Sequence, residues 1–202
     1  MNSASSLAVQ SLTCIRGRRV VFRDLSFAVG AGRLLVVEGP NGAGKTSLLR
    51  LIAGFLAPEA GRVELDGVTD AEERGKRIGW LGHHDAAKVQ FTPAETLSFF
   101  QNLYGVTADI GAALAEVGLS RVADLSCQYL SAGQKKRLAL ARLKICGRPL
   151  WLMDEPLAAL DAQGKALAAS MITAHCGAGG IAVVATHEAL GIAGETLMLG
   201  AA

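Results

Sequence analysis

The sequence lacks a strong charge of either sign: 20 Lys and Arg residues against 18 Asp and Glu residues give a formal net charge of +2 over 202 residues. A chain this close to neutral gives no indication that nucleic acid is its main partner. Its four cysteines are scattered and form no Cys-x-x-Cys pair. This spacing predicts reduced, buried thiols in a cytoplasmic protein and argues against a cysteine metal site.

Long hydrophobic runs are lacking as well. The stretch from Ala166 to Thr186 carries no Asp, Glu, Lys or Arg, but the glycine-rich break at 177–180 interrupts it, so it predicts a helix, a turn and a strand. The chain does not begin with a basic segment followed by an apolar core, so we expect no secretory signal. Half of all residues are hydrophobic, which favours either an apolar surface for a partner or fully buried parallel strands.

The sequence does contain a complete phosphate-binding loop, Gly-Pro-Asn-Gly-Ala-Gly-Lys-Thr at 39–46. Its glycines let successive backbone N–H groups turn inward around an anion, and the following helix adds the positive end of its dipole. We expect Lys45 to reach the β- and γ-phosphates and the Thr46 hydroxyl to ligate Mg²⁺. An apolar strand at 33–38 and a helix ending at Gly54 give the motif its required setting. The residues expected to contact nucleotide here are Gly39, Pro40, Asn41, Gly42, Ala43, Gly44, Lys45, Thr46 and Ser47.

A second group of candidate residues follows two other apolar strands. The strand at 150–153 is followed directly by Asp154 and Glu155, and the carboxyl ends of strands are where open α/β sheets bind their ligands. Asp154 is therefore expected to hold Mg²⁺, and Glu155 to act on the attacking water as a base or as an orienting group. His187 follows the strand at 181–185 and is expected to donate to the γ-phosphate and to sense its loss.

The segment Leu130-Ser131-Ala132-Gly133-Gln134 opens an amphipathic helix with basic residues in its first turn. Ser131 suits the N-cap, and the start of this helix predicts a second anion site. One chain cannot easily present two helix starts to the same phosphate from opposite sides, whereas two chains related by a two-fold axis can. The sequence therefore predicts a homodimer that holds nucleotide between its subunits.

The remaining pattern predicts one α/β domain over residues 1–202. Its parts are an N-terminal antiparallel β part, a P-loop core and an inserted helical subdomain at about 93–144. Strands are expected at 7–13, 24–29, 61–65, 78–81, 150–153, 181–185 and 196–199, and helices at 94–103, 110–117, 132–144 and 162–174.

In this order, the motifs resemble those of the ATP-binding subunits of ABC transporters over nearly the whole chain. Residues 39–46 match the Walker A motif, 130–134 the signature, 150–155 Walker B, 159–161 (Ala-Leu-Asp) the D-loop, and His187 the switch histidine. The resemblance implies the ABC ATPase fold, Mg²⁺-dependent hydrolysis of ATP and a nucleotide-sandwich dimer. It also implies that Ser131, Gly133 and Gln134 contact ATP bound to the opposite subunit, and that Asp161 shapes the interface near the attacking water.

Two positions depart from this family pattern. Arg16 precedes the glycine of the first hairpin, where an aromatic residue usually stacks on adenine, although a guanidinium plane can also stack on a base. The glutamine that links Mg²⁺ to the membrane partner is absent, and His83 or His84 takes its place. The register of this substitution stays open, and metal ligation by the histidine pair is the alternative.

A short ATPase with Gly-His-His at 82–84 and Trp-Leu-Met-Asp-Glu-Pro at 151–156 is similar to the ATPases of the haem exporter of bacterial cytochrome c maturation. That resemblance implies peripheral association with the cytoplasmic face of the inner membrane through integral permease subunits like CcmB and CcmC. ATP hydrolysis would then release a haem-loaded chaperone. The alternatives are an ATPase of another ABC importer or exporter, and a soluble ABC ATPase of repair or translation. Such soluble ATPases usually carry coiled-coil insertions or two cassettes, and this sequence has neither.

Overall fold

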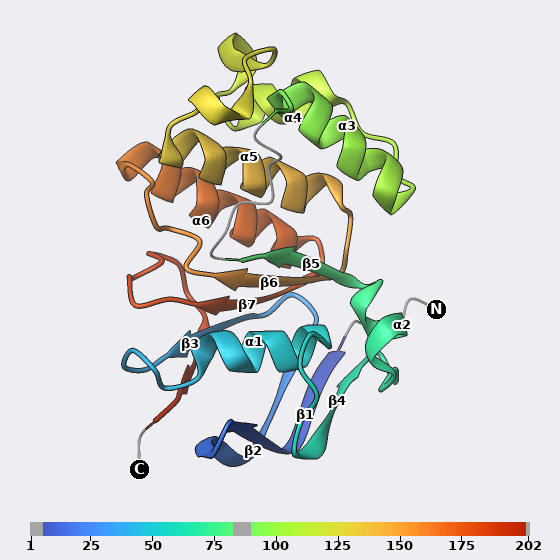
Figure 1. Ribbon diagram of the computed structural model, residues 1–202, viewed down its shortest axis with the longest axis vertical. Helices are drawn as coiled ribbons and strands as arrows, with labels where there is room; N and C mark the ends of the chain where they lie inside the picture. Colours follow the sequence, from blue (N-terminus) through green and yellow to red (C-terminus); the bar gives the residue numbers. More distant parts are fainter. Residues whose placement is uncertain (1–5, 83–89, 201–202) are drawn as a thin grey trace.

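Two β-sheets and a block of helices make up the structure, a computed structural model that describes residues 6–82 and 90–200 (Figure 1). The smaller sheet is antiparallel, with strand order β2-β1-β4. The larger sheet is parallel, with strand order β5-β6-β7-β3-β8. The predicted α/β core with an N-terminal antiparallel part is therefore confirmed. The strands are β1 (Ser6–Arg16), β2 (Arg19–Gly30), β3 (Leu34–Glu38), β4 (Ala60–Leu65), β5 (Ile78–Leu81), β6 (Leu150–Asp154), β7 (Ile181–Ala185) and β8 (Glu195–Met198).

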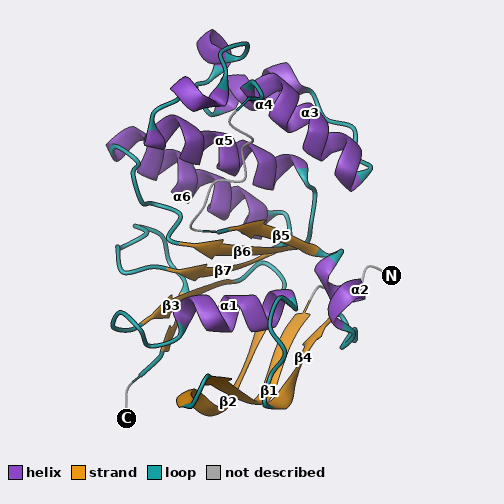
Figure 2. Ribbon diagram, in the orientation of Figure 1, coloured by secondary structure: helices purple, strands orange, loops and turns teal. Residues whose placement is uncertain are grey.

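Strands β6 and β7 are buried on both faces, which is why they read as continuous apolar runs. Successive side chains alternate between two cores: Ala182 and Val184 of β7 belong to one, and Ile181 and Val183 to the other. Helix α1 (Lys45–Ala53) covers one face of the sheet, and α5 (Ala132–Ile145) and α6 (Ala162–Gly177) cover the other (Figure 2). The helix that follows the phosphate loop and the helix that begins after Ser131 thus lie on opposite faces.

A further group of helices stacks beyond α5, away from the sheet (Figure 1). They are α3 (Pro93–Tyr104), α4 (Ile110–Glu116) and two short 3-10 turns at Ser120–Val122 and Cys127–Tyr129. A capping box between Thr92 and Glu95 begins α3, and Asp109 caps α4. The predicted helices are confirmed, with ends that move by a few residues. The division into one domain with a helical subdomain stays a prediction.

Helix α2 (Ala71–Gly75) was not predicted from the sequence. Asp70 is its N-cap. The helix carries Arg74, whose buried guanidinium donates to the carbonyl oxygens of Ile52 at 2.9 Å, Val63 at 3.2 Å and Thr69 at 2.6 Å. Ile52 lies in the last turn of α1, so Arg74 brings positive charge to the negative end of that helix dipole. It also ties the far end of the phosphate-loop helix to β4.

The long uncharged stretch folds as predicted, into most of α6, a turn and β7. Across residues 6–82 and 90–200, no helix combines the length and the apolar character needed to cross a lipid bilayer. Three cysteines, Cys14, Cys127 and Cys146, are buried as expected, whereas Cys176 is partly exposed.

Candidate functional site

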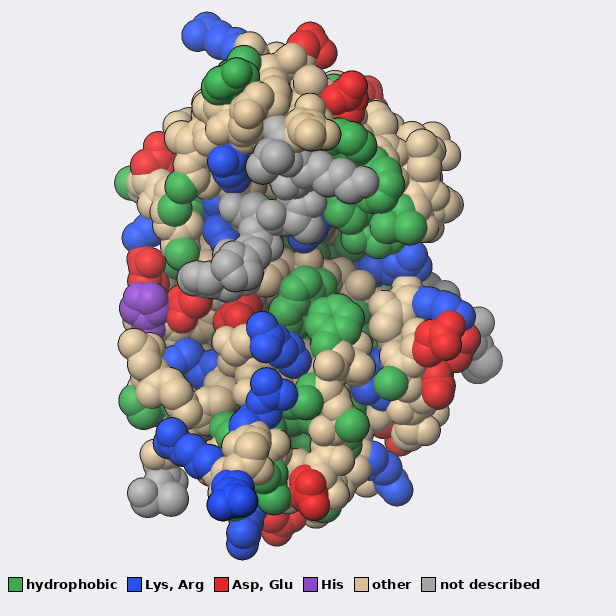
Figure 3. All heavy atoms as spheres, in the orientation of Figure 1, with side chains coloured by type: hydrophobic (Ala, Val, Ile, Leu, Met, Phe, Trp, Pro, Cys, Tyr) green, Lys and Arg blue, Asp and Glu red, His purple; other side chains and the backbone are tan. Residues whose placement is uncertain are grey.

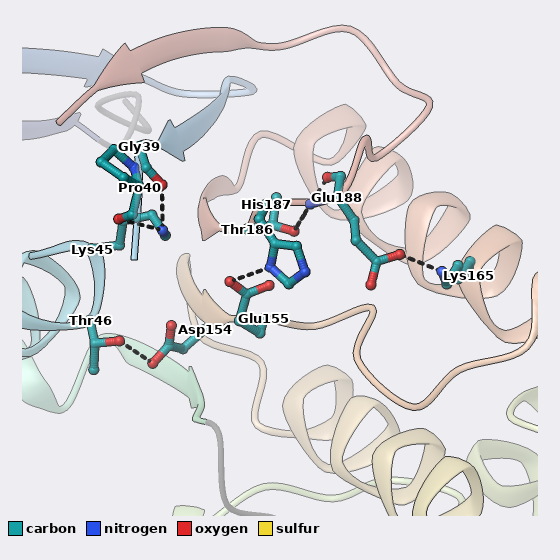
Figure 4. Close-up of polar contacts among 10 residues, drawn as sticks. All are labelled: Gly39, Pro40, Lys45, Thr46, Asp154, Glu155, Lys165, Thr186, His187 and Glu188. Atoms are coloured by element: carbon teal, nitrogen blue, oxygen red, sulfur yellow. Dashed lines mark hydrogen bonds and ion pairs between the residues drawn. The ribbon is translucent and has the colours of Figure 1, made fainter. Parts of the chain in front are cut away.

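Three adjacent strands of the parallel sheet bring the candidate residues together. Ala185, the last residue of β7, pairs with Asp154 of β6 on one side and with Val37 of β3 on the other. The segments at the carboxyl ends of these strands, 39–46, 154–155 and 186–187, therefore meet at one edge of the sheet (Figure 4). This edge is where open α/β sheets bind their ligands.

The phosphate loop is packed closely against the rest of the chain at both of its ends. Gly39 has a φ of 143°, and a Cβ there would lie 2.4 Å from the Leu199 carbonyl oxygen. Gly44 has a φ of 103°, and its Cβ would lie 2.3 Å from Cγ1 of Val21. Backbone conformation and lack of space both require glycine at these two positions. Gly44 is also the N-cap of α1 and adds no capping side chain, which leaves the first N–H groups of the helix directed toward the loop.

The Lys45 side chain folds back into this loop. Its Nζ donates to the carbonyl oxygens of Gly39 at 2.7 Å and Pro40 at 3.3 Å (Figure 4), and the residue is only 8% exposed. The ammonium group therefore lies inside the curve of the loop. It adds a full positive charge to the anion nest that the backbone N–H groups form.

Thr46 and Asp154 meet across the two chain segments. The Thr46 hydroxyl donates to Oδ2 of Asp154 at 2.9 Å (Figure 4), although the residues are 108 positions apart in sequence. Asp154 is buried. Hydroxyl and carboxylate oxygens are ligands that Mg²⁺ prefers, usually together with phosphate oxygens. This pair beside the loop therefore fits a magnesium ion bound with a nucleotide.

Glu155 and His187 form the second contact at this edge, with Oε1 of Glu155 3.0 Å from Nδ1 of His187 (Figure 4). Glu155 has a φ of +48°, which is unusual for a residue with a side chain and is the kind of strain that functional sites hold. Its backbone N–H donates to the Ala185 carbonyl oxygen at 2.8 Å. The His187 side chain is 64% exposed and that of Glu155 is 19% exposed, so both can reach a ligand at the edge.

A pocket of about 530 Å³ opens over the phosphate loop, Asp154 and Glu155, and His187 is not among its lining residues. Four lining residues were not among the predicted nucleotide contacts: Val21, Arg50, Trp80 and Gly82. Trp80 lines the pocket because β5 lies beside β6 in the sheet. The hydrophobic periodicity of a sequence does not determine the order of the strands in a sheet, so this contact could not be predicted. His83 and His84 follow Gly82 but lie outside the described residues, so the position of the missing glutamine stays open. The predicted residues that line the pocket are Asn41, Gly42, Gly44, Lys45, Thr46, Ser47, Asp154 and Glu155.

The segment at 130–134 folds as predicted but does not line this pocket. Ser131 caps α5 in a capping box: its Oγ accepts from the Gln134 N–H at 3.2 Å, and Oε1 of Gln134 accepts from the Ser131 N–H at 2.9 Å. Gly133 lies instead against the segment that follows Glu155, because a Cβ at this position would come within 2.9 Å of the Ala159 carbonyl oxygen. The start of α5 therefore packs on the chain that leaves the Glu155 end of β6.

Asp161 joins these same two parts of the molecule. Its Oδ1 caps α6 by accepting from the Gly164 N–H at 2.8 Å, and it also accepts from Nη2 of Arg137 at 2.7 Å. The hydrogen bond from Gly164, followed by the one from Arg137, lowers the pKa of the Asp161 carboxyl below its usual value. Asp161 thus holds the start of α6 against α5.

Arg16 is the one predicted nucleotide contact that lies apart from both groups. It ends β1 and pairs with Arg19 across the turn at Gly17, where φ is +61°. The side chain is exposed and does not line the pocket. Its stacking on a base stays a prediction.

Comparison with known proteins finds a matching family, similar relatives and similar solved structures. A family described as "ABC transporter" matches residues 22–158. The cytochrome c biogenesis ATP-binding export protein CcmA of Rhodopseudomonas palustris (strain HaA2) is 45% identical over 197 residues, which cover 97% of this chain and 98% of that protein. The protein of the same name from Rhodopseudomonas palustris (strain BisB18) is 50% identical, again over 97% of this chain and 98% of that protein. A solved ATP-binding subunit of an ABC transporter has the same fold, with a TM-score of 0.86 at 22% identity over 96% of this chain and 85% of that one.

Proposed function

The chain belongs to the ABC transporter family, and from this premise we propose that it is the ATP-binding and ATP-hydrolysing subunit of a membrane transporter. One observation carries the proposal: the phosphate loop, the Thr46–Asp154 contact and the Glu155–His187 contact converge at a single edge of the sheet. Together they supply an anion nest, oxygen ligands for a metal ion and a carboxylate beside them.

Each group at this edge has a role in the proposed hydrolysis. The loop N–H groups and Lys45 hold the β- and γ-phosphates. Thr46 and Asp154 would hold Mg²⁺, which when bound supplies positive charge against the phosphate oxygens. Glu155 orients the attacking water and accepts its proton. His187, whose Nδ1 lies beside Glu155, is assigned the contact with the γ-phosphate.

The site is completed by a second copy of the chain. Ser131, Gly133 and Gln134 do not line the pocket, and α5 covers the opposite face of the sheet from α1. Ser131 and Ala132 are exposed at the start of α5, where N–H groups favour an anion. A two-fold axis would place this helix start over the phosphates held by the partner's loop, and the partner's helix start over those held here.

A mixing experiment tests this shared site. We expect the ATPase rate per subunit to rise with protein concentration, and Lys45→Ala and Ser131→Arg to be inactive when assayed separately. A mixed dimer of the two variants has one site with an intact loop and an intact Ser131. The mixture should therefore recover at most about a quarter of the wild-type rate.

The control for this experiment is Asp109→Ala, which removes the cap of α4 at a cost similar to that of losing Ser131, about 1 kcal/mol. It should hydrolyse ATP normally. Hydrolysis that is first-order in protein over a wide dilution range, together with a mixture that stays inactive, contradicts the shared site.

Arg16 is expected to stack on the base of the nucleotide. Arg16→Ala should then raise the dissociation constants of ATP and GTP by similar factors, about two- to fivefold, because a stacking contact does not read base edges. Arg16→Tyr should restore most of the affinity. Arg18→Ala, in the same exposed turn, is the control. Unchanged affinity in Arg16→Ala, measured by equilibrium dialysis, would show that Arg16 is only a solvated turn residue.

We further propose that the complex is the haem exporter of cytochrome c maturation, on the basis of relatives that are 45% and 50% identical over nearly their whole length and carry the name cytochrome c biogenesis ATP-binding export protein. In this proposal the ATPase sits on the cytoplasmic face of the inner membrane. Permease subunits like CcmB and CcmC hold it there, and ATP hydrolysis releases a haem-loaded chaperone.

An apolar surface is available for the permease. Phe55, which is 66% exposed, packs edge-on against Trp80 with ring centroids 5.2 Å apart. Arg142 connects this pair to α3, because its Nη2 donates to the Trp80 carbonyl oxygen at 2.9 Å and its guanidinium lies 4.8 Å from the centroid of the Phe100 ring. Leu103 of α3 is 63% exposed. Hydrophobic side chains are visible on this face of the molecule (Figure 3), as expected for a surface that receives a helix of the partner.

Charge placed on this surface should release the permease. The double variant Phe55→Glu, Leu103→Glu is expected to reduce co-purification with the membrane subunits at least tenfold, since interface anchors each contribute 1 kcal/mol or more. ATP binding should change by less than about twofold. Met198→Glu is the control, because Met198 is similarly exposed, at 56%, but lies on β8. Equal membrane recovery of the double variant and the control would contradict this docking surface.

A further inference from the structure

An exposed tyrosine lies just before the start of α5. The Tyr129 side chain is 70% exposed, a larger fraction than for any other large hydrophobic side chain in residues 6–82 and 90–200. Within this described part of the chain, its ring makes no hydrogen bond, ion pair or ring contact. An aromatic ring presented in this way is typical of a surface that binds a partner or a flat ligand.

The turn that carries Tyr129 is held in place by buried neighbours. Cys127 is fully buried, and its N–H donates to the Phe91 carbonyl oxygen at 2.8 Å. The N–H of Tyr129 itself donates to the Ser126 carbonyl oxygen at 3.0 Å, and Leu130 is buried on the other side. The backbone that presents the ring is therefore already ordered, so that a ligand bound by the ring orders little else.

Tyr129 and Ser131 project from the same side of this segment. Leu130 lies between them with an extended backbone, φ −70° and ψ 140°, and its side chain is buried. Its two neighbours are both exposed, as residues i and i+2 of an extended segment share one face. Two residues span at most about 7 Å, which is shorter than a nucleoside triphosphate. A nucleotide whose γ-phosphate meets Ser131 can therefore reach Tyr129 with its base.

The pocket of one subunit gives a base little apolar surface. Among the described residues, the first hairpin contributes one apolar side chain to the pocket, Val21. Val21 has no partner in the β1–β2 register, which shifts at this point, and such a bulge directs its side chain out of the regular pattern. Arg16 belongs to the same hairpin. A base whose phosphates lie on the loop would thus have the hairpin on one face and solvent on the other.

We propose that Tyr129 stacks on the base of the nucleotide held by the partner subunit, so that each base lies between the Arg16 hairpin of one chain and the Tyr129 ring of the other. The inference rests on the proposed function, in which Ser131 serves the partner's phosphates. The aromatic residue that this family usually carries at the position of Arg16 is then supplied by the opposite chain. Stacking uses the face of the ring, so every base can bind, a purine with more overlap than a pyrimidine.

Mixed dimers test which chain supplies the ring. In the mixture of Lys45→Ala and Ser131→Arg, the one complete site takes its loop from the Ser131→Arg chain and its Ser131 from the Lys45→Ala chain. Tyr129→Ala added to the Lys45→Ala chain should raise KM for ATP at least about fivefold, the contribution of a base stacked on an aromatic ring. Tyr129→Ala added to the Ser131→Arg chain should change KM by less than about twofold, because that tyrosine serves the inactive site. The kcat of the mixture should be the same in both cases.

Two further variants of the Lys45→Ala chain separate stacking from a structural effect. Tyr129→Phe should change KM by less than about twofold, because the ring face makes the contact and the hydroxyl does not. Leu125→Ala is the matched control: Leu125 is also exposed, at 41%, but lies on the other side of the buried Cys127, and KM should not change. With Tyr129→Ala, KM for GTP should rise as much as KM for ATP, and KM for CTP and UTP should rise less.

Several outcomes would overturn the stacking role of Tyr129. These are equal KM values for the two placements of Tyr129→Ala, a rise in KM only when the substitution is in the Ser131→Arg chain, a lower melting temperature as the only change, or a loss in Tyr129→Phe as large as in Tyr129→Ala. In each case the mixture of Lys45→Ala and Ser131→Arg is still active, so the shared site stands. A mixture that is inactive before Tyr129 is changed contradicts the shared site, and the stacking role with it.

Discussion

Replacing Glu155 with glutamine is expected to lower the rate of ATP hydrolysis by a factor of about 10² to 10⁴, the usual contribution of a general base. Glutamine has nearly the same shape and can still hydrogen-bond His187, which lies 3.0 Å from the carboxylate. It cannot accept a proton from water. The backbone that holds the side chain in place, with its N–H donated to the Ala185 carbonyl oxygen, is unaffected by the change.

Nucleotide binding should survive this substitution, because Lys45, Thr46 and the loop N–H groups are intact. We therefore expect Glu155→Gln to accumulate as an ATP-bound dimer, visible by size-exclusion chromatography with light scattering. Glu188→Gln is the control, since it also removes a carboxylate beside His187 but one that faces Lys165; it should keep measurable turnover and form no trapped dimer. Normal turnover in Glu155→Gln would show that another group activates the water.

Much of this site could be predicted from local sequence. The phosphate loop needs glycine because the backbone has a φ of 143° at Gly39 and 103° at Gly44, and a conformation that only glycine adopts easily leaves a recognisable motif. Asp154 and Glu155 could be assigned because β6 is an uninterrupted apolar strand whose end is marked by charge. In both cases the physical constraint acts within a few residues, so a short window of sequence records it.

The rest depends on contacts between distant segments. Trp80 lines the pocket only because β5 pairs with β6, and the sequence does not state strand order. Arg74 looks like an ordinary surface charge, yet it is buried beneath the end of α1. The partners of Arg137 and Lys165 lie 24 and 23 residues away, beyond any helical or strand periodicity. Helix α2 has only five residues, too few for a hydrophobic period to show, although Asp70 was a usable start signal.

Loss of the gene is expected to abolish c-type cytochromes and to leave b-type cytochromes intact. In the proposed function, ATP hydrolysis releases a haem-loaded chaperone for cytochrome c maturation, so without the ATPase no haem would reach the c-type apoproteins. Haem that binds without covalent attachment would not depend on this route. Haem-stained gels and reduced-minus-oxidised spectra of membranes from a deletion strain would measure both classes.

Complementation connects this phenotype to the site. The wild-type gene and Met198→Glu should restore c-type cytochromes, because Met198 is exposed on β8 and outside the pocket. Glu155→Gln should not restore them, although its protein should be made and should reach the membrane. The variant Phe55→Glu, Leu103→Glu should also fail, but with little protein at the membrane, which separates loss of hydrolysis from loss of docking. Normal c-type cytochromes in the deletion strain would exclude the haem-export role and leave the ATPase assignment standing, since that rests on the loop, the Thr46–Asp154 contact and the Glu155–His187 contact.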